Sequence, residues 1–173
     1  MILTLELSLY ELLFFVATIF GGFFALLQWR QSYKLKRAEL LKEAVSKIRD
    51  DTTIAEVLYT IDYGEEWYTT EFIKNHSIEQ KYDKVFAYFD YLCYLKSKRV
   101  LSRDEFRIFE YRLIRLTNNQ SFLDYMFNLY HFSMKNGTDI SFYYLLKYLR
   151  DNTLLPNSFW DVHSANFKKI LNI

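Results

Sequence analysis

Residues 12–29 form an uninterrupted stretch without a charged side chain, LLFFVATIFGGFFALLQW. A membrane-spanning α-helix needs about 20 mostly apolar residues, so this stretch has the length and composition of a transmembrane helix. A secretory signal peptide would begin with basic residues and end at a small-residue cleavage site, and the sequence here has neither feature. A buried core helix is the other alternative. We expect the stretch to span a membrane once.

The charges on the two sides of this stretch differ in sign, with acidic residues before it and basic residues after it. Flanks rich in lysine and arginine stay on the cytoplasmic side of a membrane. The pattern predicts a single-pass protein of the inner (cytoplasmic) membrane, with its N-terminus outside and its C-terminal domain in the cytoplasm. We expect the basic flank to lie at the membrane surface, near anionic headgroups. The acidic residues are Glu6 and Glu11, and the basic ones are Arg30, Lys34, Lys36 and Arg37.

Small residues recur at intervals of four along the same stretch. Ala17, Gly21 and Ala25 fall on one helix face, and Gly22 lies on a neighbouring stripe with Thr18. Small residues at this spacing let two membrane helices approach closely. Glycine is also common in membrane helices that do not associate. The pattern favours self-association of the helix, and we expect a homo-oligomer.

The composition of the whole chain predicts an all-α fold. The 173 residues include only four glycines and one proline, too few for the turns of a β-rich protein, and a single cysteine excludes an internal disulfide framework. We expect one N-terminal transmembrane helix followed by a cytoplasmic helical domain of about six helices. The expected parts are residues 1–29, the N-terminal tail and transmembrane helix; residues 30–49, a basic juxtamembrane helix; and residues 50–173, the cytoplasmic all-α domain.

Apolar residues spaced three and four apart predict the helices of that domain. Capping boxes, in which a hydroxyl and a carboxylate or amide lie three residues apart, mark helix starts at Thr53, Ser77 and Ser102. Gly137 marks the end of a helix. A last amphipathic helix is expected over residues 158–171. Its apolar residues are Phe159, Val162, Phe167 and Leu171.

Known catalytic and metal-binding motifs are missing from the sequence. It has no glycine-rich phosphate loop, and its three histidines are far apart and outside any metal-binding spacing. Cys93 lies on an apolar helix face, as a buried structural thiol does. The closest carboxylates, Asp62, Glu65 and Glu66, could form an acid–base pair, but a solvated acidic loop explains them better. We therefore expect a protein that is not an enzyme and binds no metal or cofactor.

Charges are strongly segregated along the expected domain, although the whole chain carries a formal net charge of only +1. Residues 50–79 contain eight acidic residues and one lysine, so we expect them to face a basic surface or water. Residues 80–115 contain nine basic and five acidic residues. The small total charge argues against binding of duplex nucleic acid.

The helix expected over residues 103–117 carries the most informative polar pattern. Its apolar residues cluster on one side, and arginines, a tyrosine and an amide converge on the other. Arginine beside a stacking aromatic ring binds phosphates and bases, so this surface is a candidate site for an anionic ligand. A solvated face, or a docking site for the acidic segment, is the alternative. The candidate residues are Arg103, Arg107, Tyr111, Arg112, Arg115 and Asn118.

The layout of one N-terminal span, a basic neck and then YFDYLCYLKSKRVLSRDEFRIFEYRLIRLTNN resembles small bacterial membrane-anchored proteins with cytoplasmic helical domains. Within that class, the size and order resemble the membrane-bound effectors of type III CRISPR systems. The resemblance implies that the cytoplasmic domain senses cyclic oligoadenylate and that membrane disruption follows, as in antiphage defence.

Two main hypotheses therefore remain, beside a third, an enzyme acting near the membrane, which only the Asp62, Glu65 and Glu66 group supports. The chain is an oligomeric membrane sensor or effector that binds an anionic ligand, or it is a membrane tether that holds a partner protein through an aromatic-rich surface.

Overall fold

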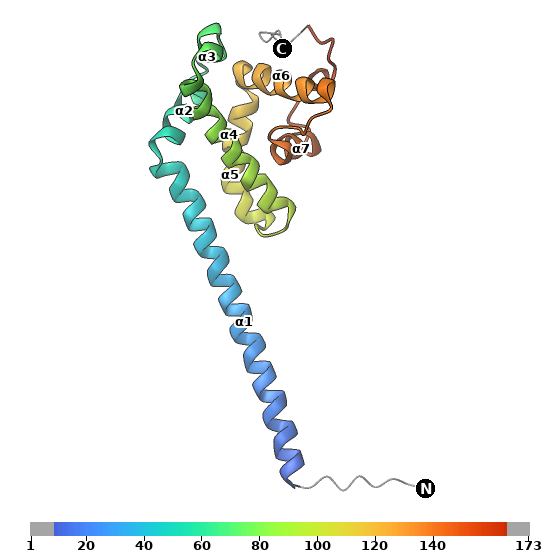
Figure 1. Cartoon of the computed structure of the whole chain (residues 1–173). Coiled ribbons are helices and arrows are strands. Elements are labelled where there is room, and N and C mark those ends of the chain that lie inside the picture. The colour runs from blue at the N-terminus through green and yellow to red at the C-terminus, as the bar shows by residue number, and fades with distance from the viewer. Residues whose placement is uncertain (1–8, 166–173) are drawn as a thin grey trace, which may run out of the picture. The chain divides into compact units, whose positions relative to one another are not determined.

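A computed structural model describes residues 9–165, and all regular structure within this range is helical (Figure 1). One long helix is followed by six further α-helices and a 3₁₀ turn, which confirms the expected all-α class and the expected number of helices. The elements are α1 (Leu9–Asp50), α2 (Thr52–Asp62), α3 (Thr70–Lys74), α4 (His76–Ser97), α5 (Arg103–Thr117), α6 (Gln120–Asn136), α7 (Tyr143–Asp151) and the 3₁₀ turn η1 (Asn157–Trp160).

Helix α1 is a single 42-residue helix that contains both the apolar stretch and the basic juxtamembrane segment. It is long and apolar enough to cross a membrane, and within the described residues none of its most apolar window is buried. At about 1.5 Å per residue it is roughly 63 Å long. A hydrocarbon core of about 30 Å would take up only half of this length.

The chain divides into two compact units between Lys42 and Glu43. The second unit begins at Glu43 and therefore includes the last turns of α1, whereas we expected the helical domain to begin at residue 50. Ala44 is buried in these turns, and its carbonyl oxygen accepts a hydrogen bond of 2.8 Å from the Tyr88 hydroxyl of α4. This bond and the small Ala44 side chain fasten the end of α1 to the domain.

Helix α4 lies at the centre of the second unit, where it contacts α2, α3 and α7 (Figure 1). Its apolar residues at helical spacing are buried as expected, and Cys93 is buried with them. Aromatic rings fill much of the core. Trp67 stacks on Tyr82 with ring centroids 4.0 Å apart, and Tyr125 meets the edge of Trp67. Rings of this size bury large apolar areas, which explains part of the chain's high aromatic content.

Of the three expected helix starts, the structure confirms only the one at Ser102. There the Glu105 amide donates to the Ser102 hydroxyl, and the Glu105 carboxylate accepts from the Ser102 amide. The other two helices begin earlier, because Asp51 and Asn75 cap α2 and α4. Aspartate and asparagine are strong capping residues, and each precedes the residue that we expected to act as the cap.

The prediction of a last helix over residues 158–171 is wrong for residues 158–165, the part that the structure describes. The chain forms only the 3₁₀ turn η1 and further turns up to residue 165, and Phe159 is buried while Val162 is exposed. Phe167 and Leu171 lie outside the described residues. The short helix α3, which begins after the Thr69 cap, was not expected from the sequence.

Candidate functional site

Helix α5 has the bounds expected from the sequence, and it presents two different faces. Phe106, Phe109, Leu113 and Leu116 are buried. Arg103, Arg107 and Tyr111 are exposed, and 61% of the Tyr111 surface is accessible to solvent. The helix therefore brings these three candidate residues to one solvent-facing side.

Two of the candidate arginines hold the carboxyl end of α2 (Asp62). Arg112 Nη1 bonds to Asp62 Oδ2, and Arg115 Nε lies 3.2 Å from Asp62 Oδ1. Arg115 Nη2 also donates to the backbone carbonyl of Asp62. A helix C-terminus carries partial negative charge, so the two guanidinium groups neutralise both the carboxylate and the end of the helix. Arg112 and Arg115 thus contact a residue of the acidic segment, which is the arrangement that the docking alternative describes.

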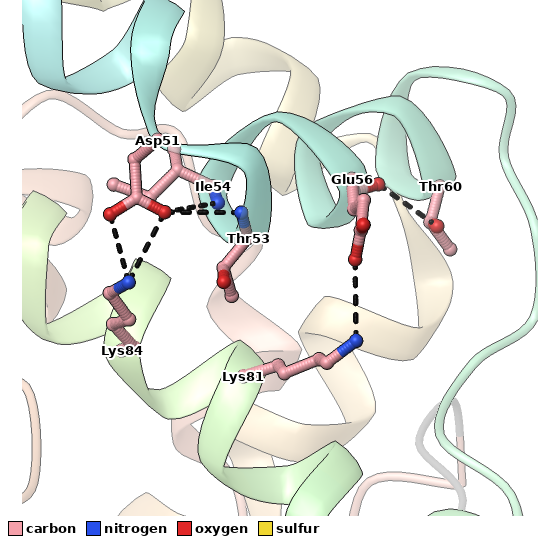
Figure 2. Close-up of polar contacts among 7 residues, drawn as sticks. All are labelled: Asp51, Thr53, Ile54, Glu56, Thr60, Lys81 and Lys84. Atoms are coloured by element: carbon pink, nitrogen blue, oxygen red, sulfur yellow. Dashed lines mark hydrogen bonds and ion pairs between the residues drawn. The ribbon is translucent and has the colours of Figure 1, made fainter.

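The acidic side of α2 also faces basic residues of α4 (Figure 2). Lys84 Nζ lies 2.8 Å from Asp51 Oδ2, and Lys81 Nζ lies 3.3 Å from Glu56 Oε2. The hydrogen bond from Lys84 lowers the pKa of Asp51, whose side chain also accepts hydrogen bonds from the backbone amides of Thr53 and Ile54. Ion pairs with α4 and α5 thus hold α2 at both ends.

The exposed face of α5 also carries apolar side chains, which were not expected from the sequence. Ile108 and Ile114 are 53% and 45% exposed, and they flank Tyr111 at helical spacing. Both fall outside the three-four pattern that marks the buried face, which is the signal that could have identified them. Tyr59 of α2 and Tyr63, the residue that caps its C-terminus, are also exposed and stack with ring centroids 6.3 Å apart.

The sixth candidate residue, Asn118, is exposed at the C-terminal cap of α5. The next residue has a different role. The Asn119 side chain is buried, and its Oδ1 accepts hydrogen bonds from Trp67 Nε1 at 3.2 Å and from the Phe122 amide at 3.0 Å. Asn119 therefore joins α6 to the segment before α3, and only Asn118 remains accessible at this end of α5.

The small-residue stripe of α1 is open along its whole length. A Cβ atom built on Gly21 or Gly22 would meet no other atom within 4 Å. Ala17 and Ala25 are exposed as well. After the apolar stretch, Arg30, Lys34 and Lys36 are exposed, and the Arg37 guanidinium lies 5.9 Å from the centre of the Tyr33 ring.

Side chains that could bind a metal ion do not gather within residues 9–165. No cluster of three or more His, Cys, Asp or Glu side chains in this range could hold a metal ion. Burial raises the pKa of the Cys93 thiol, so it stays protonated near neutral pH. His131 Nε2 lies 2.9 Å from the carbonyl oxygen of Phe159, a contact that joins α6 to η1.

The fold and the α5 surface together define an all-α domain that follows a helix of membrane-spanning length, with an exposed face that combines arginine, tyrosine and isoleucine. Comparisons of the sequence and the structure with known proteins found no matching family, no matching curated protein and no matching solved structure.

Proposed function

We propose that this chain is a membrane-anchored sensor or effector that is not an enzyme, and that its helical domain binds an anionic ligand on the exposed face of α5. The ligand class is an oligonucleotide, with cyclic oligoadenylate as the first candidate. The single observation that carries the proposal is the exposure of Arg103, Arg107 and Tyr111 on one side of one helix. Guanidinium groups suit phosphates, and a tyrosine ring suits a base.

The Asp62 contact supports this proposal. Arg112 and Arg115 already bind a carboxylate through several hydrogen bonds, so their geometry suits an anion. A phosphate that bound to them would replace Asp62 and loosen the end of α2. Only Asp51 separates α2 from α1, so a change in α2 would reach the membrane helix directly.

In this proposal α1 crosses the inner membrane once, with the N-terminus outside and the domain in the cytoplasm. The basic residues after the apolar stretch support the orientation. The open stripe of Ala17, Gly21 and Ala25 supports association of several copies through α1. Ligand binding would then rearrange the associated helices and disturb the bilayer, as part of antiphage defence.

Thermal unfolding of the full chain in detergent micelles, with a panel of cyclic and linear oligoadenylates, tests the proposal. A ligand at a hundredfold excess over its dissociation constant adds about 2.7 kcal/mol to the free energy of unfolding. We expect one ring size to raise the melting temperature, and the double variant Arg107→Ala, Tyr111→Ala to lose this rise. Lys135→Ala, which removes an exposed cation from α6, is the matched control and should keep it. No rise with any ligand would contradict the proposal.

The exposed apolar residues on α2 and α5 favour a second candidate function, a tether that holds a partner protein. Tyr63, Ile108 and Ile114 would form the centre of such an interface, since aromatic and aliphatic side chains dominate binding energy there. Ile108→Lys with Ile114→Lys should abolish capture of a partner by the membrane-bound chain. If the same variant also loses the rise in melting temperature that an oligoadenylate produces, the ligand and the partner protein bind to the same surface.

A further inference from the structure

Helix α4 runs antiparallel to the last turns of α1, which belong to the same compact unit. The Tyr88 hydroxyl of α4 donates to the carbonyl oxygen of Ala44, close to where the chain enters this unit. Lys84, one turn earlier in α4, pairs with Asp51, which follows the end of α1. The C-terminal end of α4 therefore lies on the side of the unit from which α1 enters. Figure 1 shows the turn after α4 at the end of the helical domain opposite α3.

The turn between α4 and α5 is strongly basic. Residues 96–103, KSKRVLSR, contain four basic residues and no acidic one, and we call them the α4–α5 tip. Lys98, Arg99 and Arg103 are exposed. None of these three forms an ion pair with another residue in the range 9–165, whereas Lys84 in the middle of α4 pairs with Asp51. The charge of the tip is therefore available to an anion from outside the chain.

The backbone holds the tip in one tight turn. The amides of Arg99 and Val100 donate to the carbonyl oxygens of Lys96 and Leu95, each at 2.9 Å, and the Leu101 side chain is buried. Arg99 has a φ of 58°, a left-handed conformation that glycine adopts with the least strain after a helix. An arginine at this position favours a role for its charge beyond ending the helix.

We propose that the α4–α5 tip binds anionic lipid headgroups and forms a second membrane contact in addition to α1. Basic clusters close to a membrane-spanning helix are attracted to the acidic lipids of the cytoplasmic leaflet.

The lengths of the two helices allow this contact. From Trp29, where the apolar stretch ends, to Ala44, a helix is about 22 Å long. From Tyr88, which binds Ala44, to Lys98, α4 extends about 15 Å back towards the side from which α1 enters. The two lengths differ by about 7 Å, which is close to the thickness of one headgroup layer, about 5 to 7 Å. The tip can therefore reach the headgroups.

The membrane anchor favours lipid over a free phosphate compound or an acidic partner protein. Attachment through α1 keeps lipid headgroups close to the tip at all times, at a high effective concentration, whereas a free molecule must first be captured from solution. The inference rests on α1 crossing a membrane, but not on the ligand proposed for α5. Lys98 and Arg99 precede that helix, so they can be changed while its exposed face stays intact.

Energy transfer from a dye on the tip to acceptor dyes on lipid headgroups tests this proposal. The dye is attached to Ser97→Cys, an exposed position, in the full chain. The chain is reconstituted in vesicles of phosphatidylcholine alone or of phosphatidylcholine mixed with phosphatidylglycerol. We expect more transfer in the mixed vesicles, and we expect the increase to disappear at about 1 M salt, where the Debye length falls to about 3 Å.

Substitutions at the tip separate its contact from the charges that follow the apolar stretch. The double variant Lys98→Gln, Arg99→Gln should lose the increase in transfer. The matched control Lys74→Gln, Lys135→Gln removes the same charge from exposed positions on α3 and α6, and it should keep the increase. Both double variants should keep the rise in melting temperature that an oligoadenylate produces, because neither changes α5.

Three outcomes would overturn the proposal. Transfer could be equal in the two kinds of vesicle while the chain stays inserted in both. The variant at Lys98 and Arg99 could keep the increase while its melting temperature shows that the domain is folded. Release of the unmodified chain from both kinds of vesicle by an alkaline wash would contradict the α1 anchor as well, and would thus remove the basis of both proposals.

Discussion

Asp62 binds two of the candidate arginines of α5. Its carboxylate accepts hydrogen bonds from Arg112 and Arg115, and its backbone carbonyl accepts one from Arg115. These side chains are only partly exposed, so the contact contributes more than an exposed ion pair. We expect Asp62→Asn to lower the free energy of unfolding by roughly 1 kcal/mol, as measured by chemical denaturation.

The matched control for this substitution is Glu56→Gln, which breaks the more exposed pair with Lys81 and should have a smaller effect. If Arg112 and Arg115 also serve an anionic ligand, Asp62→Asn should strengthen ligand binding, because the competing carboxylate is gone. Weaker binding in the variant would mean that the two arginines act only in the fold.

Asp83 makes the stability of the domain depend on pH in an unusual direction. Burial raises its pKa, although the hydrogen bond of 2.5 Å from the Tyr125 hydroxyl opposes the rise. The folded domain therefore holds the Asp83 proton more tightly than the unfolded chain. The contribution of Asp83 is most favourable below its unfolded pKa of about 3.9, and it declines as pH rises through its higher folded value.

Replacement of this carboxyl by an amide removes the dependence, because asparagine does not titrate. We compare the melting temperature of Asp83→Asn with that of the unmodified chain at each pH. The difference, variant minus unmodified chain, should be more positive at pH 7 than at pH 4. Thermal unfolding at several pH values measures the difference. An equal difference at both ends of the range would show that Asp83 has an ordinary pKa in the folded domain.

At the scale of single elements, α5 depends on its capping box. Ser102→Ala removes the side chain that accepts from the Glu105 amide, and substitutions of this kind lower stability by about 1 kcal/mol. The matched control is Ser97→Ala, since the Ser97 hydroxyl only donates to a carbonyl within its own helix. Denaturant titration of both variants should show a clear loss for Ser102→Ala alone. Equal losses in the two variants would mean that the capping box adds nothing to the free energy of unfolding beyond an ordinary serine side chain.

The helices could be predicted from the sequence because burial repeats every three or four residues along them. The same pattern correctly separated the buried and exposed sides of α5. Helix starts were less predictable, because Asp51 and Asn75, each two residues before the expected hydroxyl, already cap α2 and α4. The pairing of Asp62 with Arg112 and Arg115 could only be an alternative, since about 50 residues separate the partners and spacing along the chain does not show which distant charges meet.

At the scale of the whole molecule, the proposed oligomer depends on close approach of several α1 helices. A larger residue at position 21 has room within one chain, so Gly21→Leu should leave the single helix undisturbed. It should block close contact between helices and weaken association by about tenfold or more, as measured by energy transfer between labelled copies in vesicles. Ile19→Leu, on the opposite side of the helix, is the control. Unchanged association in Gly21→Leu would place the contact elsewhere.

The membrane orientation underlies every functional proposal made for this chain, and cysteine labelling measures it most directly. The only native cysteine, Cys93, is buried, so the folded chain has little background reactivity. In intact bacterial cells, a membrane-impermeant maleimide should label Thr4→Cys and should label Arg107→Cys only after lysis. Labelling of Arg107→Cys in intact cells would place the α5 surface outside the cytoplasm and contradict the proposed sensor.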